Sequence, residues 1–172
     1  AAVVLSKPLQ AGENWLGAYG DSSTEFSEEN EKNNGRSAVF VRADPDLVVT
    51  SITGVPAILK PGQSLQVKTC YQNNGKSDAV GTFKLGFFLS ANDVISRTDS
   101  KLVEATITGG LAIGKSACNT LTVTMPQTLE PGEHWGGVFV DFDLQIDEMS
   151  EKNNTHSQSF LGAGPDLVIT SL

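Results

Sequence analysis

The chain has 172 residues, 39% of them hydrophobic and 19% charged, so it can bury a core and is not a disordered tail. Its net charge of −8 at pH 7 would repel a phosphate backbone, so we expect no nucleic-acid partner. No apolar run reaches the roughly 18 residues of a membrane helix, and we expect no membrane insertion. The chain opens on Ala1 without a charged and apolar leader, which predicts a processed chain or a fragment.

Short segments in which apolar and polar residues alternate indicate strands with one buried face. In chain order these segments are 47–52, 65–70, 83–90, 102–108, 120–125, 135–140 and 157–161. Turn-forming pairs such as Pro61-Gly62 and Gly109-Gly110 separate them, and no segment predicts a helix. Seven short strands in one stretch of about 120 residues predict an all-β fold, namely an immunoglobulin-like antiparallel β-sandwich.

The chain repeats itself at an offset of 120 residues. Residues 9–52, aligned without a gap to residues 129–172, are identical at 20 of 44 positions. The identities include Trp15 with Trp135 and the tetrapeptide Glu-Lys-Asn-Asn at 31–34 and 151–154. We therefore predict that 1–44 is the C-terminal part of a preceding repeat, that 45–164 is a complete repeat, and that 165–172 is the first strand of a following one.

A series of short motifs recurs in a characteristic order along the complete repeat. They are Pro45-Asp46-Leu47-Val48-Val49, Pro61-Gly62-Gln63-Ser64-Leu65, Asn73-Asn74-Gly75, Phe88-Leu89-Ser90, Pro131-Gly132, and the run from Asp147-Glu148 to Asn153-Asn154. Their order resembles the cell-adhesion-related domain found in bacteria, CARDB. The resemblance covers 45–164 and, as partial copies, both flanks. It implies an immunoglobulin-like sandwich, tandem copies, and a secreted or cell-surface prokaryotic protein, sometimes joined to a hydrolase; it implies no catalytic residues.

The two cysteines are a departure from the family pattern. Each alternates with the apolar residues of its predicted strand, so it lies on the same face of that strand as the polar residues. An antiparallel register that sets Lys68 opposite Thr120 also sets Cys70 opposite Cys118, within reach of a disulfide. Parity allows this register without forcing it, and the alternative is two free thiols in a reducing cell. We predict an intrasheet disulfide on the outer face of the sandwich, and with it an oxidising compartment.

No catalytic or cofactor-binding residue is predicted. Residues 109–116 match the pattern of a phosphate-binding loop, but the following segment, 117–125, alternates like a strand instead of forming the required helix. His134 and His156 lie in no known catalytic spacing, and we interpret them as surface or structural residues. The repeated aromatic pairs, Trp15 with Trp135 and Phe40 with Phe160, fall on strands and are expected in the core.

Two loops, 21–34 and 141–154, each carry five acids and one lysine. The second supplies oxygen ligands of the kind that calcium prefers, so we consider a calcium site made of Asp141, Asp143, Asp147 and Glu148. The EF-hand pattern fails, because Ile146 stands at its glycine position and Lys152 at its closing glutamate. The alternative is a solvated acidic loop with Asx turns.

Asn153-Asn154-Thr155 is a formal N-glycosylation acceptor at Asn153. The alternative interpretation is an asparagine pair that tolerates left-handed backbone and caps the hairpin.

These patterns predict a non-enzymatic structural or adhesive module of a tandem-repeat protein at the cell surface or outside the cell, such as a filament or stalk subunit. Its expected partners are neighbouring repeats or copies of itself, through an end-to-end array or strand addition, and a surface protein or glycan. The alternative is an accessory domain that binds substrate or cell wall for a secreted hydrolase.

Overall fold

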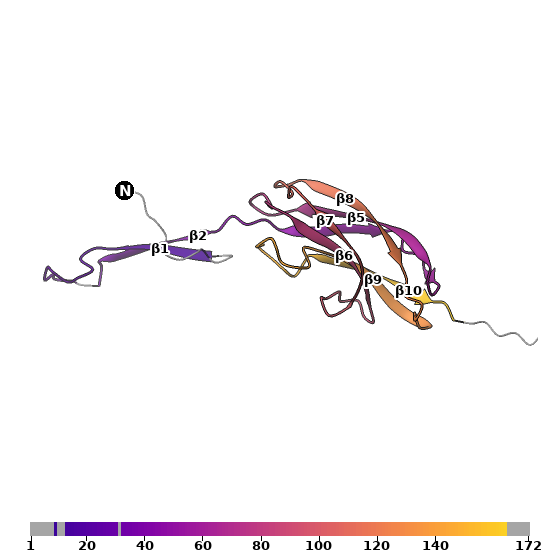
Figure 1. The fold of residues 1–172 in the computed structure, drawn as a ribbon. Helices are drawn as coiled ribbons and strands as arrows, with labels where there is room; N and C mark the ends of the chain where they lie inside the picture. Colours follow the sequence, from indigo (N-terminus) through magenta and orange to yellow (C-terminus); the bar gives the residue numbers. More distant parts are fainter. Residues whose placement is uncertain (1–8, 10–12, 31, 165–172) are drawn as a thin grey trace, which may run out of the picture. The chain divides into compact units, whose positions relative to one another are not determined.

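The computed structural model describes residues 9, 13–30 and 32–164; the first strand of a following repeat, expected at 165–172, lies outside them. The chain divides into two units, Ala1–Ala43 and Asp44–Leu172. The first unit contains an antiparallel hairpin of β1 (Glu13–Tyr19) and β2 (Gly35–Val41) (Figure 1).

The second unit is a sandwich of two sheets, as the alternation of residue types predicts (Figure 1). One sheet has the order β4-β10-β9-β6-β7 and the other the order β3-β5-β8. Each of the seven predicted strands is present. An eighth, β4, is two residues long and lies parallel to β10, too short for its pattern to be recognised. The bounds are β3 Leu47–Thr53, β4 Ile58–Leu59, β5 Ser64–Asn73, β6 Phe83–Ser90, β7 Ser100–Ile107, β8 Ser116–Thr124, β9 Gly132–Val140 and β10 Thr155–Gly162.

The main core lies between the two sheets, where the apolar residues of alternating strands meet. Along β5, Leu65 and Val67 are buried while the intervening Gln66 and Lys68 are exposed, which is the expected period of two. Tyr71 and Phe83 meet edge to face across the sandwich, with ring centroids 5.9 Å apart. No residue of the described part is helical, and it therefore contains no helix long and apolar enough to cross a membrane.

A second apolar cluster, missed by the sequence analysis, lies apart from the main core and consists of Phe88, Ile95, Phe139 and Phe142. It sits on the outer face of the five-stranded sheet, where the segment between β6 and β7 covers it. Gly137 allows this close covering, because a Cβ there would lie only 2.2 Å from Cγ1 of Ile95.

The expectation that both repeated aromatic pairs lie in the core is wrong for the two tryptophans and for Phe40, which is only partly buried. Phe160 is buried, but Trp135 is only partly buried and shares the outer-face parity of Phe139 along β9. Trp15 is 67% exposed. A large aromatic residue on a strand indicates burial against some layer, but it does not indicate which of the two faces carries that layer.

Candidate functional site

Asp141 organises the acidic loop between β9 and β10. Its carboxylate accepts hydrogen bonds from the backbone N–H groups of Gln145 (3.0 Å) and Ile146 (2.8 Å), and the Leu144 N–H donates to its carbonyl oxygen (2.9 Å). Asp141 and Leu144 have φ angles of 50° and 53°, in the left-handed region. Asp141 is buried, and burial raises its pKa. This carboxylate therefore holds the turn, as in an Asx turn.

Glu148 connects the same loop to the start of the sandwich. The side chain is 3% exposed; it accepts hydrogen bonds from the Leu47 N–H at the start of β3 and from the Asn154 side-chain amide (2.8 Å). Burial raises the pKa of Glu148 to about 8, and the charge of Glu151 contributes to this rise. The residue joins segments about 100 positions apart in the chain, which is the role of a structural anchor.

The motifs that carry the family resemblance meet at this end of the sandwich. The Asn73 side chain accepts the N–H groups of Asp46 (3.1 Å) and Gly75 (3.0 Å), and the Asn153 amide donates to the Asp46 carboxylate (2.9 Å). Gly75 approaches the chain so closely that a Cβ would lie 2.5 Å from Cα of Pro45. The motifs therefore form a hydrogen-bond network that attaches the first strand of the sandwich to two loops.

The four carboxylates considered for calcium do not form one ligand set. Asp141 and Glu148 hold amides as described above, and Asp143 lies 3.8 Å from the Lys84 ammonium. Asp147 is exposed. Within the described ranges, no group of three or more His, Cys, Asp or Glu side chains is arranged to hold a metal ion. The described residues therefore contain no assembled calcium ligand set, although Asp143 Oδ1 is buried without a hydrogen-bond partner, and the calcium site stays a prediction.

The side-chain amide of Asn153, the predicted glycosylation acceptor, already makes a hydrogen bond within the fold. Its Nδ2 donates to Asp46, and the residue is partly buried. A glycan would replace one of the two hydrogens on this nitrogen and would need space beside Asp46; the use of Asn153 as an acceptor stays a prediction.

The first unit contains the same hairpin as the end of the second, at the offset of 120. Trp15 lies opposite Val39 in the first hairpin, and Trp135 lies opposite Ser159 in the second. The Asp21 carboxylate accepts hydrogen bonds from the backbone N–H groups of Glu25 (2.8 Å) and Phe26 (2.9 Å). The Asp141 carboxylate accepts hydrogen bonds from the equivalent N–H groups of the second hairpin. Asp21 and Thr24 have φ angles of 47° and 54°, which match those of Asp141 and Leu144. The repeated sequence therefore forms a repeated structure, down to its strained turn residues.

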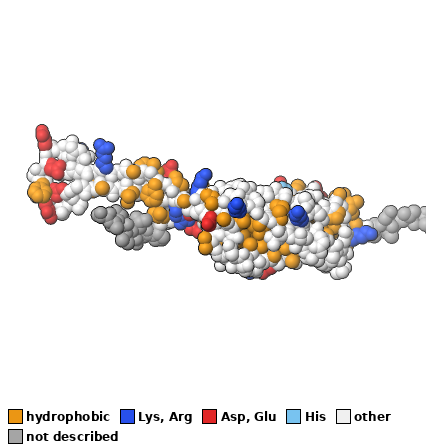
Figure 2. Space-filling view, turned by 90° about the horizontal axis from the view of Figure 1, so that it is seen from above, with side chains coloured by type: hydrophobic (Ala, Val, Ile, Leu, Met, Phe, Trp, Pro, Cys, Tyr) orange, Lys and Arg blue, Asp and Glu red, His pale blue; other side chains and the backbone are white. Residues whose placement is uncertain are grey.

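The two hairpins differ in what covers them. Ile146 in the second is 5% exposed because it lies in the main core, whereas its counterpart Phe26 is 71% exposed. Apolar side chains are visible on the surface of β1 and β2 in Figure 2. Those with large exposed areas in the first unit are Trp15, Leu16, Tyr19, Phe26, Val39 and Val41.

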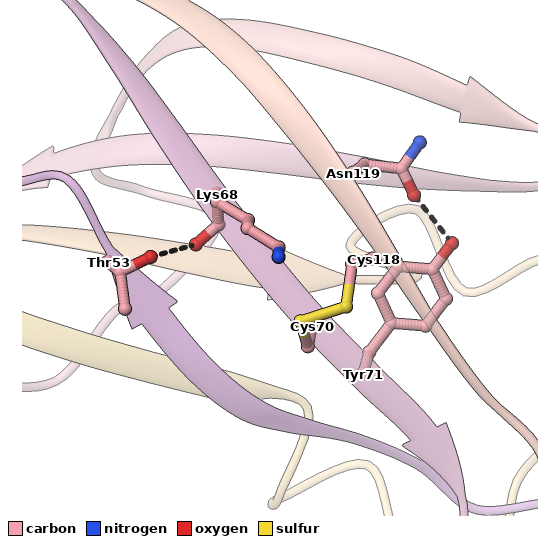
Figure 3. Close-up of a disulfide and its surroundings, with 6 residues drawn as sticks. All are labelled: Thr53, Lys68, Cys70, Tyr71, Cys118 and Asn119. Atoms are coloured by element: carbon pink, nitrogen blue, oxygen red, sulfur yellow. Dashed lines mark hydrogen bonds between the residues drawn. A yellow bond between two sulfur atoms is a disulfide. The ribbon is translucent and has the colours of Figure 1, made fainter.

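The structure contains the predicted disulfide, which lies between neighbouring strands of the three-stranded sheet (Figure 3). Lys68 lies opposite Thr120 and Cys70 opposite Cys118, in the register that the parity argument allowed. The two Cα atoms are 4.0 Å apart, and Cys118 is exposed. The bridge is therefore on the outer face and does not cross the core.

The features that resemble catalytic motifs have structural explanations. Residues 109–116 lead directly into the strand β8, so the phosphate-loop match is a coincidence, as predicted. The His134 ring lies 2.8 Å from the Glu130 carbonyl oxygen through Nε2 and stacks on Phe160. His156 is exposed and pairs with Val138 in the ladder between β9 and β10.

A shallow hollow of about 290 Å³ lies over the outer aromatic cluster. Phe88 and Phe142 line it together with Arg97, Lys101 and Asp143, and the Lys101 ammonium lies 4.6 Å from the centroid of the Phe142 ring. Its residues come from three separate segments of the chain, so no local sequence pattern indicates the hollow. The hollow has an apolar floor and a charged rim, but two of its charged residues already have partners outside it: Lys101 pairs with Glu104, and Asp143 lies 3.8 Å from the Lys84 ammonium.

Comparisons with known proteins agree with this geometry. The pattern of the CARDB family matches residues 44–158. The sandwich resembles a CARDB domain from Pyrococcus furiosus, solved in complex with di-metal ions, with a TM-score of 0.51 and 18% identity over 70% of this chain and 90% of that one. It also resembles a domain of a protein from Methanosarcina acetivorans described as a cell surface protein, with a TM-score of 0.50 and 20% identity over 70% and 93%.

A β-glucosidase from Listeria innocua matches more weakly, with a TM-score of 0.44 and 20% identity over 74% of this chain and 18% of that one. That similarity is too low to bear on activity. No curated protein sequence matches the chain.

Proposed function

The chain belongs to the CARDB family, and from this premise we propose that residues 44–164 are a non-enzymatic structural module of a tandem-repeat protein that acts at the cell surface or outside the cell. In such a protein each sandwich is a spacer, and neighbouring units form a filament or stalk. The observation that carries the proposal is the second copy of the final hairpin in the first unit.

The exposed surface of the first hairpin supports the tandem arrangement. Phe26 is exposed and no further strands cover β1 and β2 within the described residues, whereas its equivalent in the second hairpin, Ile146, lies in the core of a whole sandwich. An isolated two-stranded hairpin is marginally stable in water, and its apolar face promotes aggregation. A preceding set of five or six strands on the same polypeptide removes both problems.

A two-unit chain tests this proposal. We expect that inserting a second copy of residues 45–131 directly before Gly12 will complete the first sandwich and bury Phe26. Chymotrypsin cleavage after Phe26 should then slow by roughly tenfold or more, because cleavage requires local opening. The measurement is the rate of appearance of the Phe26 fragment by mass spectrometry, compared with the present chain.

The matched control is the same insertion with the core residues Val67, Phe83 and Val123 changed to aspartate, which lengthens the chain without forming a sandwich. Equal cleavage rates at Phe26 in the present, completed and control chains would reject the tandem module.

The disulfide supports an oxidising location. Cys118 is exposed on the outer face, and an exposed disulfide would be reduced in the cytosol of most organisms. This agrees with the cell-surface association of the family and with the cell-surface description of the related M. acetivorans protein.

For the acidic loop we propose a structural role that needs no calcium. The loop already has its own hydrogen bonds through Asp141 and Glu148, which hold its conformation without a cation. We expect the melting temperature to be the same in millimolar calcium and in chelator, measured by circular dichroism, with magnesium as the ionic-strength control. A rise in calcium that disappears in the D143N/D147N variant would instead establish the cation site, of the kind suggested by the di-metal complex of the P. furiosus domain.

A further inference from the structure

The strand β8 is an open edge that lacks the protection of the other sheet edges. It forms one end of the three-stranded sheet, and no other described strand pairs with its outer side. Its nine residues, SACNTLTVT, contain no charge and no proline, and its ladder with β5 is regular. Charges, prolines, bulges and short length are the usual features that prevent an edge strand from pairing with another chain.

The other three edges each have such a feature. The ladder between β3 and β5 has a register shift between Val49 and Ser51. The ladder between β7 and β6 has a register shift between Phe87 and Phe88 of β6. β7 also carries Lys101 and Glu104, and β4 is only two residues long. β8 is the one edge of the described sandwich where none of these features is present.

The hydrogen bonds next to β8 determine which of its backbone groups are available. The Met125 N–H donates to the Gln63 carbonyl (2.9 Å), and the Asn73 N–H donates to the Lys115 carbonyl (3.0 Å). In an antiparallel ladder the bonded pairs recur every two residues, so odd-numbered residues of β8 bond to β5. The N–H and C=O groups of Cys118, Thr120 and Thr122 therefore point away from the sheet.

The side chains along this edge suit a second copy of the same strand. The five outer-face residues of β8 are exposed and small, and four of them carry hydroxyl groups: Ser116, Cys118, Thr120, Thr122 and Thr124. Residues of this kind already pair within the sheet, since Ser64 and Thr124 hydroxyls lie 2.8 Å apart and the Gln66 amide donates to Thr122 (2.9 Å). Cross-strand pairs of this kind stabilise sheets.

We propose that β8 is a self-association site, at which it pairs antiparallel with β8 of a second copy to form a continuous six-stranded sheet. A register centred on Thr120 sets Thr120 opposite itself and Cys118 opposite Thr122 of the second copy. This register keeps all outer-face residues on one face. Lys115, the charged residue that precedes β8 in the chain, then lies at opposite ends of the new ladder in the two copies. Lys68, which lies beside Thr120 on β5, is separated from its counterpart in the second copy by the two paired β8 strands, so like charges are not directly opposite each other.

Residue-specific hydrogen exchange on the full chain tests the proposal and does not depend on association through the first hairpin. We expect exchange of the Cys118, Thr120 and Thr122 amides to slow by at least roughly tenfold as protein concentration rises from micromolar to millimolar. The amides of Ala117, Asn119 and Leu121 bond to β5 and should be protected at every concentration, which provides an internal control.

Two variants block the edge in different ways. T120P removes an outward N–H, which its own sheet does not use, and T120K sets two ammonium groups opposite each other. Both should abolish the concentration dependence of the Cys118 and Thr122 amides, whereas Q66K, with the same charge on the inner strand of the same face, should retain it. Unprotected Cys118, Thr120 and Thr122 amides at millimolar concentration would overturn the proposal, whether the wild-type chain is monomeric or associates through another surface.

Discussion

Replacing Glu148 with glutamine is expected to remove most of the loss of stability that the protein undergoes between pH 5 and pH 8. The carboxyl is 3% exposed, and burial raises its pKa from the ordinary value of 4.5 to about 8. In this pH range the folded protein retains a proton on Glu148 that the unfolded chain releases. The unfolding free energy therefore falls as the pH rises through the window.

The size of this effect follows from the two pKa values. One pKa unit corresponds to about 1.4 kcal/mol, so the full interval from 4.5 to about 8 corresponds to at most about 5 kcal/mol. Stability from this group is fully present below pH 4.5 and is lost as the pH approaches 8. Glutamine carries no charge at any of these pH values and retains an oxygen that can accept the Leu47 N–H.

Urea unfolding at pH 5, 6, 7 and 8 measures the change. A smaller slope should remain in E148Q, because burial also raises the pKa values of Asp141 and Glu151. The matched control is E104Q, since Glu104 lies on the surface with a pKa lowered by Lys101 and Lys84, and it should leave the slope between pH 5 and 8 unchanged. An E148Q slope equal to that of the wild type would show that Glu148 is ionised in the folded protein throughout this range.

Removing the Cys70–Cys118 bridge is the other large effect expected. The bond closes a loop of 48 residues, and cross-linking a loop of this length reduces the entropy of the unfolded chain by the equivalent of about 4 kcal/mol. Because Cys118 is exposed and Cys70 partly buried, a pair of serines can replace them on the outer face without burying a hydroxyl. The C70S/C118S variant should therefore fold to the same sandwich with a much lower melting temperature.

Thermal unfolding with and without reductant measures this difference. Reductant should lower the melting temperature of the wild type and leave that of C70S/C118S unchanged. Alkylation of the unfolded protein without reductant, followed by mass measurement, should find no labelled cysteine. Two labelled cysteines in protein isolated from its native location would contradict both the bridge and the argument for an oxidising compartment.

Features that depend on the period and parity of a strand can be predicted from the amino-acid sequence alone. Alternation identified seven strands and separated the buried Val67 and Leu121 from the exposed Lys68 and Thr120, and the shared parity of the two cysteines indicated their register. These inferences succeed because a strand has a side-chain period of two, so that a shift of one residue would place apolar side chains in water. The offset of 120 likewise indicated the second hairpin, since similar local sequences form similar turns.

Which polar and aromatic residues are covered depends on contacts between distant segments, and no local pattern predicts it. Glu148 has the sequence appearance of a calcium ligand, yet it is buried and accepts a hydrogen bond from the N–H of Leu47, 101 residues earlier in the chain. Trp135 and Phe139 share one parity on β9, but Phe139 is buried under the segment that contains Ile95, whereas Trp135 stays partly exposed. The local sequence pattern predicts which residues share one face of a strand. The burial of those residues depends on which distant segment packs on that face, and this packing is a property of the whole fold.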